Sequence, residues 1–271
     1  MLYHSENYTT TQIGQAIATV IADSTYNGHR ITTLELVYPR YIHSELMTHR
    51  AFSRNASSSR ATPIAVLTEE VKNDPVFFDY VGKNKAGMVA GEELTAEELA
   101  AFKRDWYELG AYVSDAVFAM AHRYNIHKQT LNRALEPWSR IRTLVTATEW
   151  DNFFNLRLAP DAQPEMNSLA QAMQEAMLVS EPKAAILHTP YVKEGDCDID
   201  LRFPVSVARC ARVSYGRVNG KASTIDEDLE LYERLKLAGH LSPFEHVATG
   251  MAQGQYANFT GWQSLRSQLH L

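Results

Sequence analysis

The 271-residue chain lacks the features that mark several large protein classes. It contains only two cysteines, Cys197 and Cys210, which are not spaced like metal ligands and which exclude a disulfide framework as the main source of stability. No run of about 18 apolar residues is present, and the first residues show no signal-peptide pattern. The sequence therefore predicts a cytoplasmic protein with reduced cysteines.

Basic charge is scarce as well. The chain has 26 Lys and Arg against 32 Asp and Glu, a net charge of −6, so no overall field attracts nucleic acid. The Gly-x-Gly-x-x-Gly, Gly-Lys-Ser/Thr and Gly-x-Ser-x-Gly patterns are absent, which argues against a Rossmann turn, a phosphate loop and a serine hydrolase elbow. His240, Glu245 and His246 are close in sequence but match no zinc spacing, and we predict no metal.

The basic charge that is present is concentrated in residues 48–60, which we call the basic loop. Arg50, Arg54 and Arg60 lie there among serine, threonine and asparagine side chains, together with His49. These groups provide fixed positive charge and many donors, which phosphate oxygens require. The alternative is a solvated surface loop. Because the whole chain is acidic, a small anionic ligand suits this loop better than a polymer.

The segments before and after the basic loop predict a scaffold for it. Asn27-Gly28 between the β-type stretches 18–24 and 30–38 is typical of a hairpin. Pro39 opens a short helix that ends near His49. Residues 68–93 lose their periodicity and predict an irregular excursion or a lid.

The rest of the chain predicts alternating helices and strands within one α/β domain, residues 1–271. A capping box at Thr95 opens a long helix, whose apolar stripe from Leu99 to Met120 we interpret as core. The other expected elements are a short helix over 127–135, a strand over 141–150, helices over 162–178, 204–213 and 224–238, a strand from Val247, and an aperiodic connector over 181–203.

Two further arginines extend the candidate anion site. Arg133 lies on the short helix, and Arg157 follows Asn152-Phe153-Phe154-Asn155-Leu156, where a donor and aromatic faces are neighbours. A flat heterocycle can stack and accept hydrogen bonds in such a place. The alternative for Arg157 is a surface ion pair.

Three blocks of the sequence together resemble the flavin-dependent thymidylate synthases. The first is Thr48-His49-Arg50, then seven residues and Ser58, which resembles the Arg-His-Arg motif of that family. The second is Asn152 to Arg157, followed by Ala162-Gln163-Pro164-Glu165. The third comprises Ala211 to Tyr215 and the Ser-Pro-Phe-Glu-His stretch of 239–246. In the usual family order the Ser-Pro-Phe-Glu-His stretch comes first, so its position here resembles a circular permutation, with 181–203 as the connector.

The resemblance implies a fold, cofactors and partners. The fold would be a single domain with a central, mainly antiparallel sheet flanked by helices. The activity would be reductive methylation of dUMP to dTMP, with FAD as cofactor and NADPH and methylenetetrahydrofolate as co-substrates. A homotetramer with active sites shared between subunits, and no contact with nucleic acid or membrane, would be expected.

The resemblance also implies roles for individual residues. Arg157 and Ser58 would be catalytic, with Arg157 stabilising charge on the uracil ring. The residues implied in FAD binding are His49, Arg50, Asn152, His240, Ser242 and Glu245. Those implied in dUMP binding are Glu45, Ser58, Ser59, Arg60, Arg133 and Arg157.

Several positions depart from the family pattern. Thr48 replaces an arginine, Glu45 a glutamine and Ala56 a glutamate. We hypothesise that Arg266 or Arg40 supplies the missing phosphate contact. Two other functions stay open: a related flavoenzyme that methylates or hydroxymethylates a different pyrimidine nucleotide, and a nucleic-acid-binding module that uses the basic loop.

Overall fold

The computed structural model describes residues 8–215 and 222–269, with two antiparallel sheets and helices on both faces of the larger one. The larger sheet has the strand order β1-β2-β3-β5-β4, and the short β6 pairs in parallel with β2. Its strands are β1 Thr10–Ile13, β2 Ala16–Tyr26, β3 His29–Pro39, β4 Ser53–Ala56, β5 Arg140–Ala147 and β6 Lys183–Ala184. The smaller sheet contains β7 Leu187–His188, β8 Ala248–Tyr256 and β9 Phe259–Ser264. The expected central, mainly antiparallel sheet is confirmed.

The hairpin of β2 and β3 forms at the predicted turn. Asn27 and Gly28 have φ angles of 48° and 81°, the two positive values that a type I′ turn requires. After β3 come a 3-10 turn, η1 Arg40–Ile42, and the short helix α1 His43–Leu46, which ends three residues before His49. The predicted helix from Pro39 is therefore present as two short pieces.

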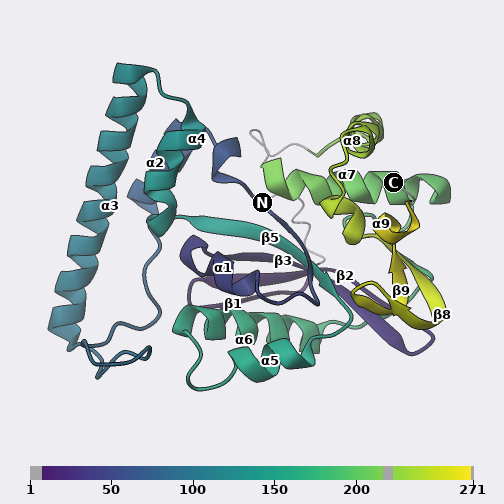
Figure 1. Ribbon diagram of the computed structural model, residues 1–271, viewed down its shortest axis with the longest axis horizontal. Helices are drawn as coiled ribbons and strands as arrows, with labels where there is room; N and C mark the ends of the chain where they lie inside the picture. Colours follow the sequence, from purple (N-terminus) through teal and green to yellow (C-terminus); the bar gives the residue numbers. More distant parts are fainter. Residues whose placement is uncertain (1–7, 216–221, 270–271) are drawn as a thin grey trace.

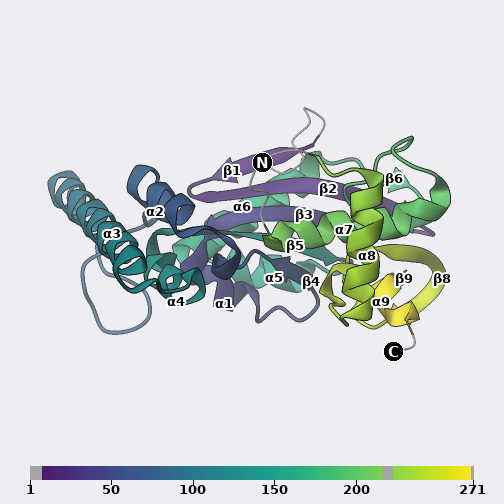
Figure 2. The ribbon, with the colours of Figure 1, turned by 90° about the horizontal axis from the view of Figure 1, so that it is seen from above.

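Helices cover both faces of the larger sheet (Figures 1 and 2). On one face α6, Pro164–Val179, packs against β1 and β2, and α5, Asp151–Arg157, lies beside it. On the other face α7, Arg202–Tyr215, packs against β4 and β5, and α8, Ile225–Leu237, lies on α7. The remaining helical elements are α2 Ile64–Asn73, α3 Ala96–Tyr124, α4 Lys128–Leu131, α9 Leu265–Gln268, and the 3-10 turns η2 Ser59–Ala61, η3 Asn132–Trp138, η4 Ile199–Leu201 and η5 Ser242–Glu245.

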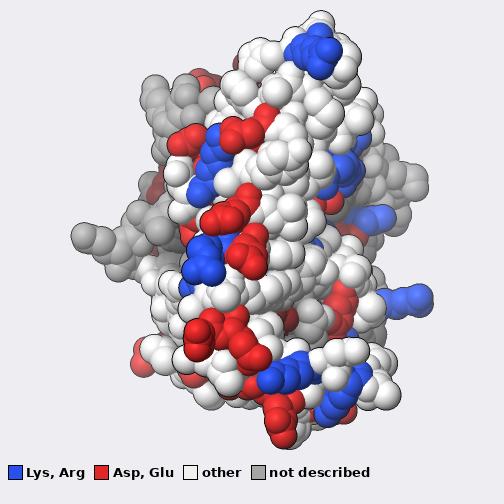
Figure 3. Space-filling model, turned by 90° about the vertical axis from the view of Figure 1, so that its left-hand side faces the viewer, with Lys and Arg blue, Asp and Glu red and all other residues white. Residues whose placement is uncertain are grey.

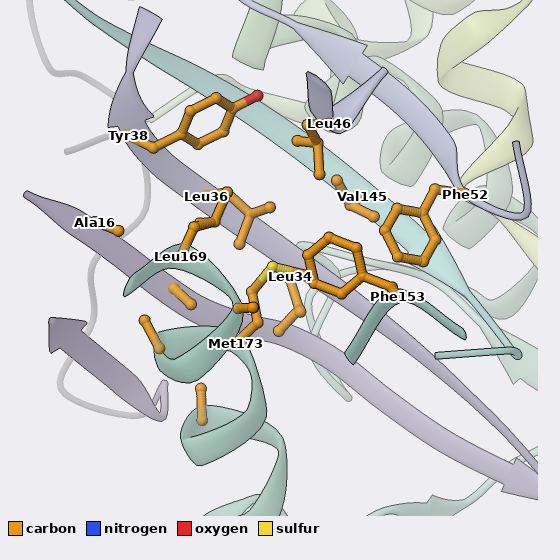
Figure 4. Close-up of a cluster of buried hydrophobic side chains, with 14 of the residues drawn as sticks. Ala16, Leu34, Leu36, Tyr38, Leu46, Phe52, Val145, Phe153, Leu169 and Met173 are labelled. Atoms are coloured by element: carbon orange, nitrogen blue, oxygen red, sulfur yellow. The ribbon is translucent and has the colours of Figure 1, made fainter. Parts of the chain in front are cut away.

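The main core lies between the sheet and α6 (Figure 4). Leu34 and Leu36 of β3 and Val145 of β5 are fully buried against Leu169 and Met173 of α6. Alternate residues of a strand point to one face, so the apolar residues of β3 and β5 meet the apolar stripe of the helix. This core fixes the positions of α5 and β4, which carry the candidate site.

The expectation of an irregular excursion over 68–93 is wrong for residues 68–73. Residues up to Asn73 belong to α2, whose Leu67 and Val71 are buried against Trp138 and α3. Only 74–95 is irregular, with one isolated bridge between Gly82 and Glu93. The sequence signal was weak because α2 buries only Leu67, Thr68 and Val71, while its exposed positions mix apolar, acidic and basic side chains.

The long helix α3 begins at the predicted capping box, with Thr95 and Glu98 exchanging hydrogen bonds. The interpretation of its whole apolar stripe as core is wrong, because Leu109 is 49% exposed and Met120 38% exposed. The helix stands at the edge of the molecule, where α2, α4, η3 and the segment 74–95 contact it, the last through the hydrogen bond from Trp106 Nε1 to the Val76 carbonyl. Its outward side carries separate acidic and basic side chains (Figures 1 and 3). Gly110 allows the contact with η3, since a Cβ there would lie 2.9 Å from Trp138 Cδ1.

Candidate functional site

The strand β4, within the basic loop, contacts the third block although about 160 residues separate them. Asn55 Nδ2 donates to the Cys210 carbonyl at 2.8 Å, and Ser214 Oγ donates to Asn55 Oδ1 at 2.6 Å. The backbone N–H of Ser58 donates to the Ser214 carbonyl at 3.4 Å. These bonds hold the C-terminal part of α7 along the loop.

The Ser-Pro-Phe-Glu stretch, η5, also packs against β4. The turn between β8 and β9 adds a second link, because Asn258 Nδ2 donates to the Ala51 carbonyl at 3.1 Å and to Ser53 Oγ at 3.0 Å. The third block therefore lies on the basic loop, as a shared site requires.

Arg157 joins the second block to the first. From the last turn of α5, its Nε lies 2.9 Å from His49 Nε2, Nη1 binds the Glu45 carboxylate, and Nη2 lies 3.5 Å from Thr48 Oγ1. The side chains of Arg157 and Glu45 are only 18% and 25% exposed. We call Glu45, Thr48, His49 and Arg157 the Arg157 group. A partly buried guanidinium held on three sides is fixed in direction, which a group that stabilises developing charge needs.

His49 is held in one protonation state by this arrangement. Arg157 Nε can only donate, so His49 Nε2 must accept, which leaves a neutral ring with its proton on Nδ1. Burial lowers the pKa of His49, and the charges of Arg157 and Arg54 lower it further. Phe153 packs edge-on against the ring, with centroids 4.9 Å apart.

A second cluster lies at the other end of β4, and we call Ser59, Arg133 and Glu136 the Glu136 group. Glu136 Oε1 accepts from Ser59 Oγ at 2.8 Å and from Arg133 Nη1 at 2.9 Å. Asn132 Nδ2 donates to the Ser59 carbonyl at 2.8 Å, which fixes η2 against η3. Arg133 stays 59% exposed, so its remaining donors face solvent. Beside this group, Ser58 Oγ accepts from the Arg60 backbone N–H at 3.3 Å, and the Arg60 side chain is exposed.

The Arg157 group and the Glu136 group are distinct within one chain. His49 precedes β4 and Ser58 follows it, so the extended strand of four residues separates them by roughly 13 Å or more. Across residues 8–215 and 222–269, no hydrogen bond or ion pair joins the two groups. The fold brings Arg157 to His49 and Glu45, and Arg133 to Ser59, but it does not bring Arg157 to Arg133.

Two basic side chains, Arg54 and Arg266, are engaged within the protein, and a third, Arg40, lies away from Thr48. Arg54 Nη1 donates to the carbonyls of Met47 at 2.7 Å and His49 at 2.9 Å, so it holds the start of the loop together. Arg266 forms an ion pair with Glu245, so it supports a residue that the resemblance assigns to FAD. Arg40 lies in η1, close to the Glu136 group and away from Thr48.

The other residues implied in FAD binding offer unoccupied donors. Arg50, Asn152 and His240 are exposed, and none makes a side-chain hydrogen bond or ion pair to another residue that the structure describes. Ser242 begins η5 beside β4. A guanidinium, an amide and an imidazole suit a diphosphate and the polar edge of an isoalloxazine ring, so the residues present fit FAD.

Two contacts in these groups had weak sequence signals. Thr48 was noted only as a missing arginine, yet it is a neighbour of Arg157. Glu136 is not among the candidate site residues expected from the sequence, although its position three residues after Arg133 on a helical turn predicts an ion pair.

Cysteine and metal chemistry receive no support from the part of the chain that is described. Cys210 is fully buried in α7, and burial raises the pKa of its thiol. In residues 8–215 and 222–269, no three His, Cys, Asp or Glu side chains are grouped as a metal site would require. Within the same residues, no helix is both long and apolar enough to cross a membrane.

Comparisons with known proteins identify the family. Two solved structures are distant matches: a flavin-dependent thymidylate synthase, ThyX, from Helicobacter pylori complexed with FAD and dUMP, and a UMP/dUMP methylase, PolB, from Streptomyces cacaoi. The first has 19% identity and a TM-score of 0.39, covering 54% of this chain and 67% of that one. The second has 15% identity and a TM-score of 0.46, covering 62% and 91%. A search of curated protein sequences found no significant match.

The sequence profile of the thymidylate synthase complementing proteins, Thy1, matches residues 22–182, more than half of the chain. This stretch contains the first two blocks, and the third lies outside it. By that match, the chain belongs to the thymidylate synthase complementing protein family.

Proposed function

We propose that this protein is an FAD-dependent thymidylate synthase that converts dUMP to dTMP. The observation that carries the proposal is the position of Arg157, which brings the second block to His49 of the first and to Glu45 just before it, more than 100 residues away. FAD reduced by NADPH would supply a hydride and pass on the methylene carbon of methylenetetrahydrofolate, while the proton on C5 of uracil is lost.

The residues of the chain would bind and orient the substrates. Arg157 donates to a uracil carbonyl and stabilises the negative charge that develops when C5 becomes nucleophilic. Arg133, Arg60 and Ser58 bind the 5′-phosphate and sugar, and η2 is supported by Ser59 through Glu136. The residues that hold FAD are His49, Arg50, Asn152, His240, Ser242 and Glu245.

The proposal predicts a specific product. Purified protein incubated with FAD, NADPH, methylenetetrahydrofolate and dUMP is expected to form dTMP, identified by mass spectrometry. Omission of any one component is expected to abolish product formation, apart from FAD that co-purifies. Binding of an oligonucleotide that weakens steeply with salt, without any methylated nucleotide, would instead indicate a nucleic-acid-binding module.

A second candidate is a related enzyme that acts on a different pyrimidine nucleotide, and the Glu45 carboxylate favours it. Where the family pattern has a glutamine amide, this chain places an acceptor-only group beside Arg157. Such an acceptor favours a base with an amino group at its edge. If Glu45 selects the base in this way, Glu45→Gln should lower kcat/KM for dCMP at least about tenfold more than for dUMP. Equal effects on the two nucleotides would leave Glu45 as a positioning residue for Arg157 only.

The permuted motif order stays a prediction, and a chain of buried contacts supports it. His246, at the end of the third block, has its Nδ1 2.8 Å from Thr146 Oγ1, which lies 2.6 Å from Thr33 Oγ1 near the middle of β3. The third block therefore ends beside the strand that leads into the basic loop. In the usual family order these two segments are consecutive, so the permutation leaves their contact in place.

Assembly into a homotetramer with shared sites is likewise a proposal. In one chain the Arg157 group and the Glu136 group lie at opposite ends of β4, and a site that needs both can be completed by a second subunit. Exposed apolar side chains on α3, among them Tyr112 at 72% and Tyr124 at 58%, are available for subunit contacts. We propose NADPH and the folate as soluble co-substrates and the cytoplasm as the location.

A further inference from the structure

Arg40 is a partly buried cation without a partner. It begins η1 directly after β3, and its backbone N–H donates to the Ser139 carbonyl at 3.0 Å. Its Nε is buried and makes no hydrogen bond. The guanidinium forms no hydrogen bond or ion pair with any residue in 8–215 or 222–269. A charge in this state costs folding free energy, so a binding role is the simplest reason for its presence.

The surroundings of Arg40 point to an anion. The turn η3 packs against both η1 and η2, so Arg40 and the Ser59 segment both lie next to the turn that carries Arg133 and Glu136. The carboxylates whose charge favours the Arg40 cation are Glu136 and Glu70. Glu136 Oε1 accepts from Ser59 and Arg133, and although its charge favours the Arg40 cation, no hydrogen bond or ion pair joins it to Arg40 among the described residues.

The electrostatics agree with this geometry. Burial lowers the pKa of Arg40, and the neighbouring charge of Arg133 lowers it too, against opposing effects of Glu136 and of Tyr38. Two neighbouring guanidinium groups repel each other, but their arrangement becomes favourable once a doubly charged anion lies between them.

We propose that Arg40 and Arg133 together bind the 5′-phosphate of the nucleotide substrate, an inference that rests on the proposed function. Arg40 belongs to the side of β4 that carries Ser58, Ser59, Arg60 and Arg133. The diphosphate of FAD is the other phosphate source, but Arg50 and Asn152 lie with the Arg157 group at the opposite end of the strand. The nucleotide phosphate is therefore the ligand that the position of Arg40 fits.

The experiment compares Arg40→Gln with Arg202→Gln in the full-length, FAD-loaded protein. Arg202 is a matched control, since its Nε is also buried without a hydrogen bond, but it lies at the start of α7. We expect Arg40→Gln to weaken dUMP binding, measured by calorimetry, about 10- to 100-fold. Binding of deoxyuridine, which lacks the phosphate, and of FAD is expected to change less than about twofold in both variants.

Thermal unfolding is a second measurement that distinguishes a binding role of Arg40 from a purely structural one. Without nucleotide, Arg40→Gln is expected to melt at the same or a higher temperature, because an uncompensated charge is removed. Saturating dUMP should raise the melting temperature of the wild type more than that of Arg40→Gln.

Each outcome bears on a different statement. If the wild type binds dUMP and Arg40→Gln binds it equally well, the inference is wrong and the proposed function stands. If Arg40→Gln weakens the binding of FAD and not that of dUMP, Arg40 binds the cofactor and the inference is also wrong. If the wild type binds no dUMP, the proposed function fails and the inference falls with it.

Discussion

Replacing Arg157 by Ala is expected to lower kcat for dTMP formation by about 100- to 1,000-fold, the usual effect of removing one preplaced donor from a developing negative charge. Arg157 is the residue at which Glu45, Thr48 and His49 converge, and its side chain is largely buried. Its loss removes stabilisation made mainly in the transition state, so kcat should fall more than dUMP affinity. Steady-state kinetics with the reduced enzyme, together with dUMP calorimetry, provide the measurement.

Two variants separate this role from a general loss of structure. Arg157→Lys keeps the charge but not the planar fork, and it is expected to recover only part of kcat. Arg104→Ala removes a guanidinium from the exposed side of α3 and is expected to have wild-type kinetics. A kcat of Arg157→Ala within about threefold of wild type would assign Arg157 to a structural ion pair.

Mixing of inactive subunits extends this test to the shared site. If Arg157 and Arg133 of one site come from different subunits, equal mixing of Arg157→Ala and Arg133→Ala protein should restore about one quarter of the sites. The mixture would need conditions under which subunits exchange, verified by tagged subunits in pull-down. No recovery after proven exchange would show that both arginines of a site belong to the same chain.

Acidification is expected to destabilise the protein through two buried histidines. His188 bridges Ser24 and Thr33 at 2.9 and 2.8 Å, and His246 bonds Thr146 at 2.8 Å with its Nε2 unpaired. Burial lowers the pKa of each ring to about 3, and His246 adds to the effect on His188.

The sign of the effect follows from proton binding. Between pH 6.5 and 3 the unfolded chain binds these protons and the folded chain does not, so the stability is complete above pH 6.5 and falls as the pH is lowered. At pH 5 the free energy of unfolding should be lower than at pH 8 by about 2 kcal/mol for each histidine. Urea unfolding at the two pH values measures the difference.

Matched variants assign this loss to the named residues. His246→Asn is expected to reduce the decrease between pH 8 and pH 5 by about half, whereas His122→Gln, on the exposed side of α3, leaves it unchanged. NMR titration of the wild type covers the case in which His246→Asn does not fold. Ring signals of His188 and His246 that titrate near pH 6.5 would contradict the prediction.

The local signals in the sequence were sufficient for most of the fold. Asn27-Gly28 predicted the turn, since only residues that tolerate positive φ fit there, and the capping box at Thr95 predicted the start of α3. These features depend on neighbouring residues. The extent of α2 and the exposure of Leu109 were missed because they depend on what packs against each helix.

The sequence by itself determined the chemical content of the candidate site: the arginines, the serines and the three blocks, of which the first two lie in the stretch that matches the family profile. Only the tertiary structure decided which of them act together. Arg157 meets Glu45 and His49 because the core between α6 and the sheet fixes α5 beside the end of α1, and the turns that carry Arg40 and Arg133 are neighbours because η3 packs against η1. Such pairings cross more than 90 residues of chain and depend on the burial of apolar surface elsewhere, which no local pattern records.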